Sequence, residues 1–473
     1  MESVIQHAKL PGRLLMVGFG SIGQAVLPLL LRHLALQPGQ ISIVSAHEDG
    51  REIAAAHGVA FARSPLTEAN HESLLDAQDL RAGDFLLNLS VDVSSLALLR
   101  WCEPRGLLYL DTCTEPWPGL YTDPRLPPTQ RSNYALREQV LAFGRAHPGG
   151  PTAIMTMGAN PGLISSFVKQ ALLDLAADAG LPSGLPASRA DWAGLARDLG
   201  VRVIHVAERD TQVCSRHKRR DEFVNTWSVD GFVSEGCQPA ELGWGSHERH
   251  WPEQAGWHGY GCDAAIYLQR PGAATRVRSW TPLEGPYHGF LITHAEAISI
   301  ADHLTLRSGS ELVYRPTVHY AYHPCDDAVL SLHEFAGRNW RLQSIQRIAR
   351  DEIVAGVDEL GVLLMGQAGG IYWYGSRLDI AQARERVPHN SATSLQVAAG
   401  VLAGVAWALH HPRVGVLEPD DLPHDFVLGI ARPYLGELLG VRGDWDPLRD
   451  RGRLFEEAVD PADPWQFRNF LVA

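Results

Sequence analysis

The chain has 473 residues, of which 45% are hydrophobic and 20% charged, the composition of a soluble globular protein with two or three domains. Its formal net charge of −13 argues against a nucleic-acid partner, because phosphate contact needs clustered Lys and Arg. Six scattered cysteines without a CxxC pair, and an N-terminus without a basic and then apolar leader, predict a reduced, cytoplasmic protein.

The first stretch of the chain predicts the beginning of a parallel, dinucleotide-binding sheet. Residues 13–19, RLLMVGF, form an apolar strand that runs into GFGSIG and a helical pattern, and a second strand starts at Ile41. In GFGSIG, Gly18 permits a tight turn, Gly20 lets the backbone approach a pyrophosphate, and Gly23 allows close packing of helix on strand. A lone GxGxxG also marks ordinary turns, but the order of strand, motif, helix and strand favours a cofactor site.

The end of the second strand bears on which dinucleotide binds. The usual NAD site has an acidic residue there to hold the ribose, whereas this strand ends in Ser45, Ala46 and His47. No Arg follows directly to receive the 2′-phosphate of NADP, so NAD is the predicted cofactor. The predicted cofactor-binding residues are Gly18, Gly20, Ser21, Ile22, Gly23, Ser45, Asn88, Asp92, Thr112 and Asn160.

Two later strands, beginning at Phe85 and Leu107, end in polar side chains at the predicted carboxyl edge of the same sheet. Asp92 follows the first of them, where capping of the next helix is an equally good interpretation. Glu115 follows the second and precedes a Pro-Trp pair, a poor helix start, which favours a site role. Residues 1–148 are therefore predicted to form an α/β, Rossmann-like, doubly wound domain that binds NAD.

Beyond this domain, short strands and aromatic-rich loops predict a second, α+β domain at residues 149–389. Residues 390–473 return to long helical patterns and are predicted to pack back on the first domain. The apolar run at 395–409 is shorter than the roughly 18 residues of a membrane span, so we expect a buried helix and no membrane partner.

Three polar residues of the second domain stand at the ends of predicted elements. Asn160, in the strand-to-helix turn GANPG, either caps the helix or points its amide at a ligand. Glu208 directly follows an apolar strand, where the alternative is a solvated loop charge. His294 begins a helix and is either an acid–base group or a structural one.

Two histidine pairs have spacings that would suit a metal on a helix, but their surroundings are typical of loops and strands. They are His247 with His250 and His319 with His323. Because no third ligand stands at a recognisable distance, no metal site is expected.

The stretch EFVNTWSVDGFVSEG, residues 222–236, alternates like a strand and surrounds Trp227 with acidic residues. A Trp packed in the core is the ordinary interpretation, and a box for a cationic substrate is the alternative. The alternation places Glu222 on the face opposite Trp227 and leaves Asp230, beside a glycine, as a turn residue. Trp227 and Glu235 are the two retained candidates.

Taken together, the blocks GFGSIG, NLSVDVSS, LDTCTEPW, MGANPGLIS, AERDTQ, NTWSVDGFVSEG, ITHAEAISIADHL and NSATSLQVAAG resemble the bacterial homospermidine synthases of the saccharopine dehydrogenase-like group. The resemblance covers nearly the whole chain. It implies an NAD-dependent homodimer that forms homospermidine and ammonia from two putrescines, or from putrescine and spermidine, with substrate binding and dimerisation in the second domain. It assigns catalytic roles to Glu208, Trp227, Asn160 and His294 and substrate binding to Asp92, Glu115, Glu235, Asn390 and Glu359, with Asp358 as the alternative to Glu359.

The charge of a polyamine also suits these residues. A diamine is a dication near neutral pH, so spaced carboxylates can hold its ammonium groups, and a desolvated aromatic face adds about 2 kcal/mol of attraction. One alternative is a saccharopine-type amino-acid dehydrogenase, which would need Arg or Lys clamps for the substrate carboxylates. Another is a non-catalytic NAD- or polyamine-binding protein, which would release no ammonia.

Overall fold

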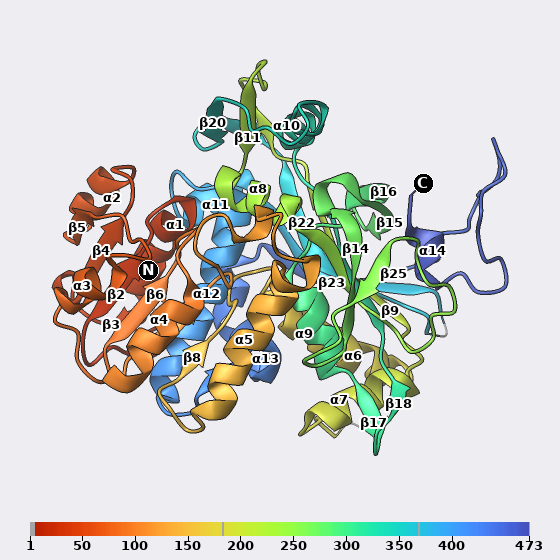
Figure 1. The fold of residues 1–473 in the computed structure, drawn as a ribbon, viewed down its shortest axis with the longest axis horizontal. Coiled ribbons are helices and arrows are strands. Elements are labelled where there is room, and N and C mark those ends of the chain that lie inside the picture. Colours follow the sequence, from red (N-terminus) through yellow and green to blue (C-terminus); the bar gives the residue numbers. More distant parts are fainter. Residues whose placement is uncertain (1–4, 182–183, 368, 473) are drawn as a thin grey trace.

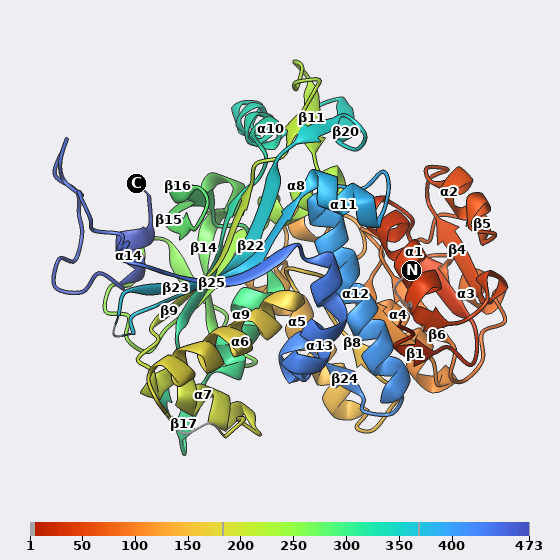
Figure 2. The same ribbon diagram turned by 180° about the vertical axis from the view of Figure 1, so that it is seen from behind.

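Two sheets of different character lie side by side in the structure, a computed structural model that describes residues 5–181, 184–367 and 369–472 (Figures 1 and 2). The first sheet has seven strands, all parallel, in the order β24-β8-β7-β6-β2-β4-β5. Its central strands are buried on both faces, which explains their continuous apolar sequences. The strands are β2 (Leu14–Val17), β4 (Ile41–Ser45), β5 (Ala60–Arg63), β6 (Phe85–Asn88), β7 (Leu108–Asp111), β8 (Ala153–Ile154) and β24 (Val416–Leu417).

The second sheet has ten strands and is mixed. Its middle strand, β9, runs parallel to β19 and antiparallel to β22. The strands are β9 (Val203–Asp210), β12 (Pro239–Gly243), β13 (Ala255–Trp257), β14 (Ala265–Pro271), β15 (Arg276–Thr281), β16 (Gly285–Phe290), β19 (Thr317–His323), β22 (Val357–Met365), β23 (Ile371–Asp379) and β25 (Glu437–Gly443). The two sheets give the Rossmann-like and α+β parts that the sequence predicts.

Helices cover both sheets and fill the space between them (Figure 1). Those of the first part are α1 (Ser21–His33), α2 (Arg51–Ala56), α3 (His71–Asp76), α4 (Ser95–Cys102), α5 (Asn133–Ala146), α12 (Ala392–His410) and α13 (His424–Ala431). Those of the second part are α6 (Leu163–Asp178), α7 (Arg189–Asp198), α8 (Val229–Cys237), α9 (Ala295–His303), α10 (Asp326–Gly337), α11 (Ile380–Arg386) and α14 (Phe467–Phe470). Two small strand pairs are β1 (Ala8–Lys9) with β3 (Leu34–Ala35) and β17 (Leu306–Ser308) with β18 (Glu311–Tyr314).

A small cap projects from the second part, at the top of Figure 1. We use the name cap for β10 (Val213–Cys214), β11 (Glu222–Asn225), α10, β20 (Ile345–Ile348), β21 (Ile353–Ala355) and the loops that join these strands. Its strands come from segments more than a hundred residues apart, since β11 pairs with β20 and β10 with β21. This pairing places the loop after β20 close to α1 of the first part, where Arg350 bonds Gln24.

The sequence predicts that residues 390–473 are a helical segment that packs back on the first part. The structure instead divides this segment between the two parts. Helix α12 packs against α1, and β24 joins the first sheet, whereas β25 joins the second sheet beside β23. The α12 helix is long and apolar enough to cross a membrane, with a mean hydropathy of 1.6, but 89% of that stretch is buried inside the protein. The expected buried helix is therefore confirmed, and the segment as a whole ties the two parts together.

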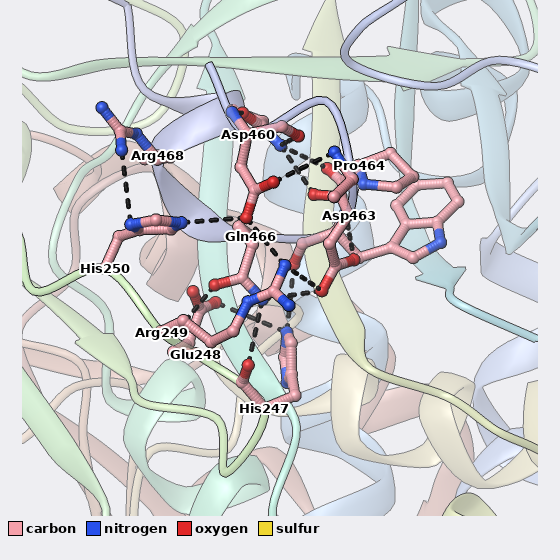
Figure 3. A network of polar contacts seen from close by, with 12 residues as sticks. His247, Glu248, Arg249, His250, Asp460, Asp463, Pro464, Gln466 and Arg468 are labelled. Carbon is pink, nitrogen blue, oxygen red and sulfur yellow. Dashed lines mark hydrogen bonds and ion pairs between the residues drawn. The ribbon is translucent and has the colours of Figure 1, made fainter. Parts of the chain in front are cut away.

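The last residues, 460–472, form a latch on the face of β9 opposite Glu208. Phe467 and Phe470 are fully buried there, and Phe470 lies against His205 of β9. Figure 3 shows how polar contacts hold the latch to the segment 247–250. Gln466 accepts a hydrogen bond from the Arg249 N–H at 2.7 Å and donates to the His247 carbonyl at 2.9 Å.

Substitution of Gln466 by Ala is expected to lower the free energy of unfolding by about 1–3 kcal/mol, because it leaves the partly buried Arg249 N–H and His247 carbonyl without these partners. Gln466 is fully buried, whereas Gln382 is exposed and serves as the control, with an expected change within about 0.5 kcal/mol for Gln382→Ala. Urea denaturation followed by circular dichroism measures both. Equal midpoints for the two variants would show that the latch does not depend on this side chain.

Candidate functional site

A cavity of about 820 Å³ lies between the carboxyl edge of the first sheet and the end of β9. Such an edge is where ligands bind in open parallel sheets. Most of the predicted site residues line it. They are Gly18, Gly20, Ser21, Ile22, Ser45, Asp92, Thr112, Glu115, Asn160, Glu208, Trp227, Glu235 and His294.

The three glycines of GFGSIG meet different surroundings. Gly18 has a φ of +86°, and a Cβ on it would lie 2.7 Å from the Leu89 carbonyl, so the turn requires glycine. A Cβ on Gly23 would lie 3.0 Å from the Gly18 oxygen, in keeping with close helix packing, and Gly23 does not line the cavity. A Cβ on Gly20 would meet no atom within 4 Å, and would occupy the open cavity.

The start of α1 suits an anion in this cavity. Gly20 is the N-cap of α1, and no side chain caps the helix there, so its first N–H groups are free for a ligand. At the end of β4, Ser45, His47 and Asp49 line the cavity. Arg63 binds the Ala46 carbonyl at 3.3 Å but is not a lining residue. The residues present therefore fit a dinucleotide, with a glycine cradle for its diphosphate.

Glu208, at the end of β9, is the centre of a buried hydrogen-bonded group. Its carboxylate accepts a hydrogen bond from Asn160 Nδ2 at 2.6 Å and another from the Tyr320 hydroxyl. Asn160 Nδ2 also lies 2.6 Å from the Tyr320 oxygen. Burial raises the pKa of Glu208 to about 8, against the lowering effect of the bond from Tyr320. A carboxyl group with this pKa can accept and return a proton near neutral pH.

His294 joins two carboxylates beside that group. Its Nε2 lies 3.0 Å from Glu235 and its Nδ1 3.1 Å from Glu296. Burial alone would lower the pKa of His294, but the two carboxylates outweigh it and raise the pKa well above the usual value. The imidazole ring also lies against Tyr320, with centroids 4.4 Å apart. His294 is therefore held as a cation at the N-terminus of α9 and fixes Glu235 in place.

The stretch around Trp227 is not the continuous strand that the sequence predicts. Strand β11 ends at Asn225, and Ser228 caps α8 by accepting a hydrogen bond from the Gly231 N–H at 3.0 Å. The serine-to-glycine spacing of a helix cap, S-x-x-G, overrides the alternation. Asp230 is thus in the first turn of α8 and lines the cavity, and the prediction of a turn residue is wrong.

Helix α8 nevertheless leaves both retained candidates in the cavity. Trp227 is half-buried, and its indole N–H donates to the Tyr322 hydroxyl at 3.4 Å. Its backbone carbonyl accepts a hydrogen bond from Ser21 of α1, which joins the cofactor loop to the Trp. Glu222 is bound to Arg216 and Arg347 and does not line the cavity, as its assignment to the opposite face predicts.

Asp92 and Glu115 continue the acidic lining. Ser94, not Asp92, caps α4, accepting from the Ala97 N–H at 3.3 Å, so the helix-cap interpretation of Asp92 is wrong. Burial and then the charge of Asp230 raise the pKa of Asp92. Burial, followed by the charges of Glu235 and Asp92, raises the pKa of Glu115 to about 8. These carboxylates are close enough to repel one another, and a cationic ligand would relieve the repulsion.

Several predicted residues lie elsewhere. Glu359 pairs with Arg377 and accepts from the Leu283 N–H, so its prediction as a substrate ligand is corrected. Register explains this, because Asp358 and Glu208 lie on one face of the sheet and Glu359 on the other. Asp358 faces the site and accepts from Thr393, which lines the cavity.

At two more predicted positions, a nearby residue lines the cavity in place of the predicted one. Asn390 donates to the Pro388 carbonyl outside the cavity, and Thr393 of the same NSATS block lines it instead. Asn88 does not line the cavity, but its side-chain oxygen accepts a hydrogen bond at 2.5 Å from the hydroxyl of Ser90, which does.

The histidine pairs serve packing and the latch. His247 binds the Trp465 carbonyl, and His250 binds Asp460, as Figure 3 shows. The His319 ring lies against the His205 ring at a tilted angle, with centroids 4.0 Å apart. Within residues 5–181, 184–367 and 369–472, no three His, Cys, Asp or Glu side chains are grouped as metal ligands.

Sequence reasoning missed Tyr320 and Tyr322. They stack on each other with centroids 5.2 Å apart and join Glu208 to Trp227 through their hydroxyls. The signal was present in HYAYH, where the tyrosines alternate on one face of a strand.

Comparison with known proteins places these features in a family. Residues 14–154 match the family described as "Saccharopine dehydrogenase NADP binding domain", and residues 158–444 match "Saccharopine dehydrogenase C-terminal domain". A homospermidine synthase of Blastochloris viridis is 53% identical over 470 residues, which are 98% of each chain. One of Mesorhizobium japonicum is 48% identical over 472 residues, 98% of this chain and 97% of that one.

Solved structures agree with these relatives. The crystal structure of the homospermidine synthase from Legionella pneumophila in complex with NAD is 47% identical and has a TM-score of 0.92, with 98% of each chain covered. Saccharopine dehydrogenase from Saccharomyces cerevisiae, at 11% identity and a TM-score of 0.50, covers 91% of this chain and shares the fold alone.

Proposed function

This chain belongs to the homospermidine synthase family, and we propose on that premise that it joins two putrescines into homospermidine with release of ammonia, using bound NAD. The observation that carries the proposal is the acidic lining around Trp227. Asp92, Glu115, Glu208 and Glu235 converge there, and burial or mutual repulsion raises the pKa of the first three. A diamine dication supplies the missing positive charge.

The reaction exchanges one C–N bond for another. When bound, NAD takes a hydride from the amine-bearing carbon of one putrescine and returns a hydride to the final imine, so no net oxidation occurs. Between these events the amine of the second putrescine adds to the first imine, and ammonia leaves. The protein must therefore hold two cations in turn, move protons between amines, and keep water from the imine.

The residues for the cofactor follow from the cavity. The free N–H groups at the start of α1 and the open space over Gly20 suit the diphosphate, and Ser45 with Asp49 lies where the adenosine ribose would be held. Thr112 and Asn160 lie on the Glu208 side of the cavity, where the nicotinamide end would be held. NAD rather than NADP is supported by the absence of an arginine from the lining residues around Ser45 in the described chain.

Gly20→Val is expected to fold normally and to lose NAD. The new side chain meets no protein atom near its Cβ, but it fills the space through which the diphosphate would approach the backbone. Isothermal titration with NAD should show at least about a 100-fold weaker Kd, equivalent to ~2.7 kcal/mol. Circular dichroism gives the folding control. Retention of NAD with wild-type affinity would place the diphosphate elsewhere.

In the substrate part, proton transfer is assigned to Glu208. Its carboxylate is buried, is oriented by Asn160 and Tyr320, and has a pKa of about 8, so it can take a proton from an ammonium and return it to a leaving amine. Trp227 offers its face to the cationic intermediate, and Glu235, Glu115 and Asp92 orient the other ammonium groups.

The direct test incubates the purified chain with putrescine and substoichiometric NAD, and measures homospermidine and ammonia by mass spectrometry and a coupled assay. Product in excess of NAD is the expected result. Accumulation of NADH without homospermidine would favour an amino-acid-type dehydrogenase. Binding of NAD and putrescine with no ammonia release would favour a non-catalytic binding protein.

Assembly and location complete the proposal. The family resemblance supports a homodimer, which light scattering on the purified chain tests. All six cysteines lie in the described residues and are free, which supports a reducing, cytoplasmic location. The net charge of −13 and the burial of α12 support a protein without nucleic-acid or membrane partners.

A further inference from the structure

The cap forms part of the wall of the cofactor cavity. Gln346, Arg347, Ile348 and Arg350 line the same cavity as Gly18, Gly20 and Ser21, although they come from the second half of the chain. Figure 1 shows the cap above α8 and near α11, on the side that faces α1. The glycine-rich loop is thus faced across the cavity by a segment that brings two guanidinium groups.

The two arginines differ in how their charges are balanced. Arg347 is bound to Glu222 at 2.9 Å and to Glu352 at 2.6 Å, so its charge is neutralised within the cap. Arg350 has no carboxylate within ion-pair distance in the described part of the chain. Glu352 accepts a hydrogen bond from the backbone N–H of Arg350, but among the described residues the one side chain that the guanidinium itself binds is the neutral amide of Gln24, 3.2 Å from Nη1.

Gln24 shows where the unpaired charge of Arg350 lies relative to the glycine-rich loop. Gln24 is in the first turns of α1, and its Nε2 donates to the Phe19 carbonyl at 3.0 Å, inside GFGSIG. Only the Gln24 side chain therefore separates the Arg350 guanidinium from the glycine-rich loop. The remaining N–H groups of the guanidinium have no protein partner among the described residues. An unbalanced cation at a helix N-terminus is well placed for an anion.

We propose that Arg350 of the cap binds the pyrophosphate of the dinucleotide, so that the cap clamps the cofactor against the glycine-rich loop. The inference rests on the proposed function, because it takes NAD as the ligand. It explains how the cofactor stays in place while two substrates and ammonia exchange beside it. The anion gains a charge-assisted partner from outside the Rossmann-like part, and the clamp closes the cavity over the loop.

Direct titration of the nucleotide-free full chain with NAD, ADP-ribose, NADP and adenosine tests the clamp. Arg350→Gln should weaken NAD and ADP-ribose by about 10- to 100-fold, the effect of losing a charge-assisted hydrogen bond, and leave adenosine unchanged. Arg350→Lys should recover part of the loss. Arg220→Gln removes the same charge from an exposed position elsewhere in the cap, outside the cavity, and should match wild type.

The outcomes separate this inference from the proposed function. Unchanged NAD affinity in Arg350→Gln would overturn the clamp while leaving the proposed function intact. A loss confined to NADP would also overturn it, because it would assign Arg350 to the ribose 2′ position. An equal loss for adenosine, which has no phosphate, would overturn it as well, because the substitution would then have distorted the site. Failure of the wild-type chain to bind NAD would overturn both. Circular dichroism confirms that the variants compared are folded.

Discussion

Replacement of Glu208 by Gln is expected to lower kcat by about 10²- to 10⁴-fold while NAD remains bound, because the change removes the proposed proton acceptor and keeps the shape of the side chain. The amide oxygen can still accept a hydrogen bond from Asn160 or Tyr320, so the surrounding group stays in place. Stopped-flow assays of ammonia release and titration with NAD measure the two quantities. A variant that turns over at the wild-type rate would remove Glu208 from the reaction.

The pH dependence gives a second readout of the same residue. The pKa of Glu208 is raised to about 8, so the carboxylate required for proton uptake forms as the pH rises through that value. In wild type, kcat/KM should therefore increase up to about pH 8 and fall again as the substrate loses its charge near an amine pKa of about 10. The rise should become shallower in Glu208→Gln, and Glu115, with a pKa of about 8, accounts for the remainder.

The contribution of Glu208 to the free energy of unfolding should change with pH in the direction opposite to kcat/KM. A carboxyl group whose pKa is higher in the folded state than in the unfolded state favours folding when it is protonated, and this contribution declines as the pH rises from about 4.5 towards about 8. The Gln variant has no charge to bury, so its Tm should equal or exceed that of wild type at about pH 9. A lower Tm would mean that its loss of activity reflects misfolding.

Replacement of Trp227 by Ala is expected to lower kcat/KM for putrescine by about 30-fold or more, since a desolvated cation–π contact contributes roughly 2 kcal/mol. NAD affinity should change little, because the contact between Trp227 and Ser21 of α1 is made by the Trp backbone carbonyl, which the substitution retains. Steady-state kinetics measures kcat/KM for putrescine, and titration measures the affinity for NAD. Equal losses in both would show that the ring supports the cofactor loop and not the substrate.

Trp227→Phe is the matched control. It retains an aromatic face but loses the indole N–H that donates to Tyr322, so its activity should fall between those of wild type and Trp227→Ala. A Phe variant as inactive as the Ala variant would mean that orientation by Tyr322, and not the aromatic face, is what the reaction requires. Tyr322→Phe, which keeps the ring stack and removes the hydroxyl, then separates these two contributions.

The family's fold and cofactor loop could be predicted from the sequence because their signals are local. Gly18, Gly20 and Gly23 follow a strand and open a helix within one short segment, and each glycine meets the surroundings that its role requires. Asp92 and Glu115 could also be selected, because they follow parallel strands that end at a common edge of the first sheet. Glu208 could be selected because it stands near the end of an apolar strand, β9 of the second sheet. These features depend on neighbours in sequence.

Other assignments failed where alternation competed with another local signal. The residues from Glu222 to Val229 alternate like a strand, yet Ser228 caps a helix. Asp230 is therefore a helical residue that lines the cavity and not the turn residue that the alternation predicts. Asp358 and Glu359 are adjacent carboxylates on one strand, and only the pairing of β22 with β9 decides which of them faces Glu208. A shift of one residue reverses the face, and no property of the two residues themselves reveals it.

The sequence by itself determined the parallel sheet, the glycine-rich loop, the acidic residues at the strand ends and the family of the chain, since each depends on short stretches of contiguous residues. The tertiary structure alone decided how His294 is held between Glu235 and Glu296, how Tyr320 meets Glu208, and where Arg350 lies relative to α1. Apart from the local contact between His294 and Glu296, those contacts join residues that are tens to hundreds of positions apart. They depend on how the second sheet and the cap close over the first, and that packing is a property of the whole core rather than of any one motif.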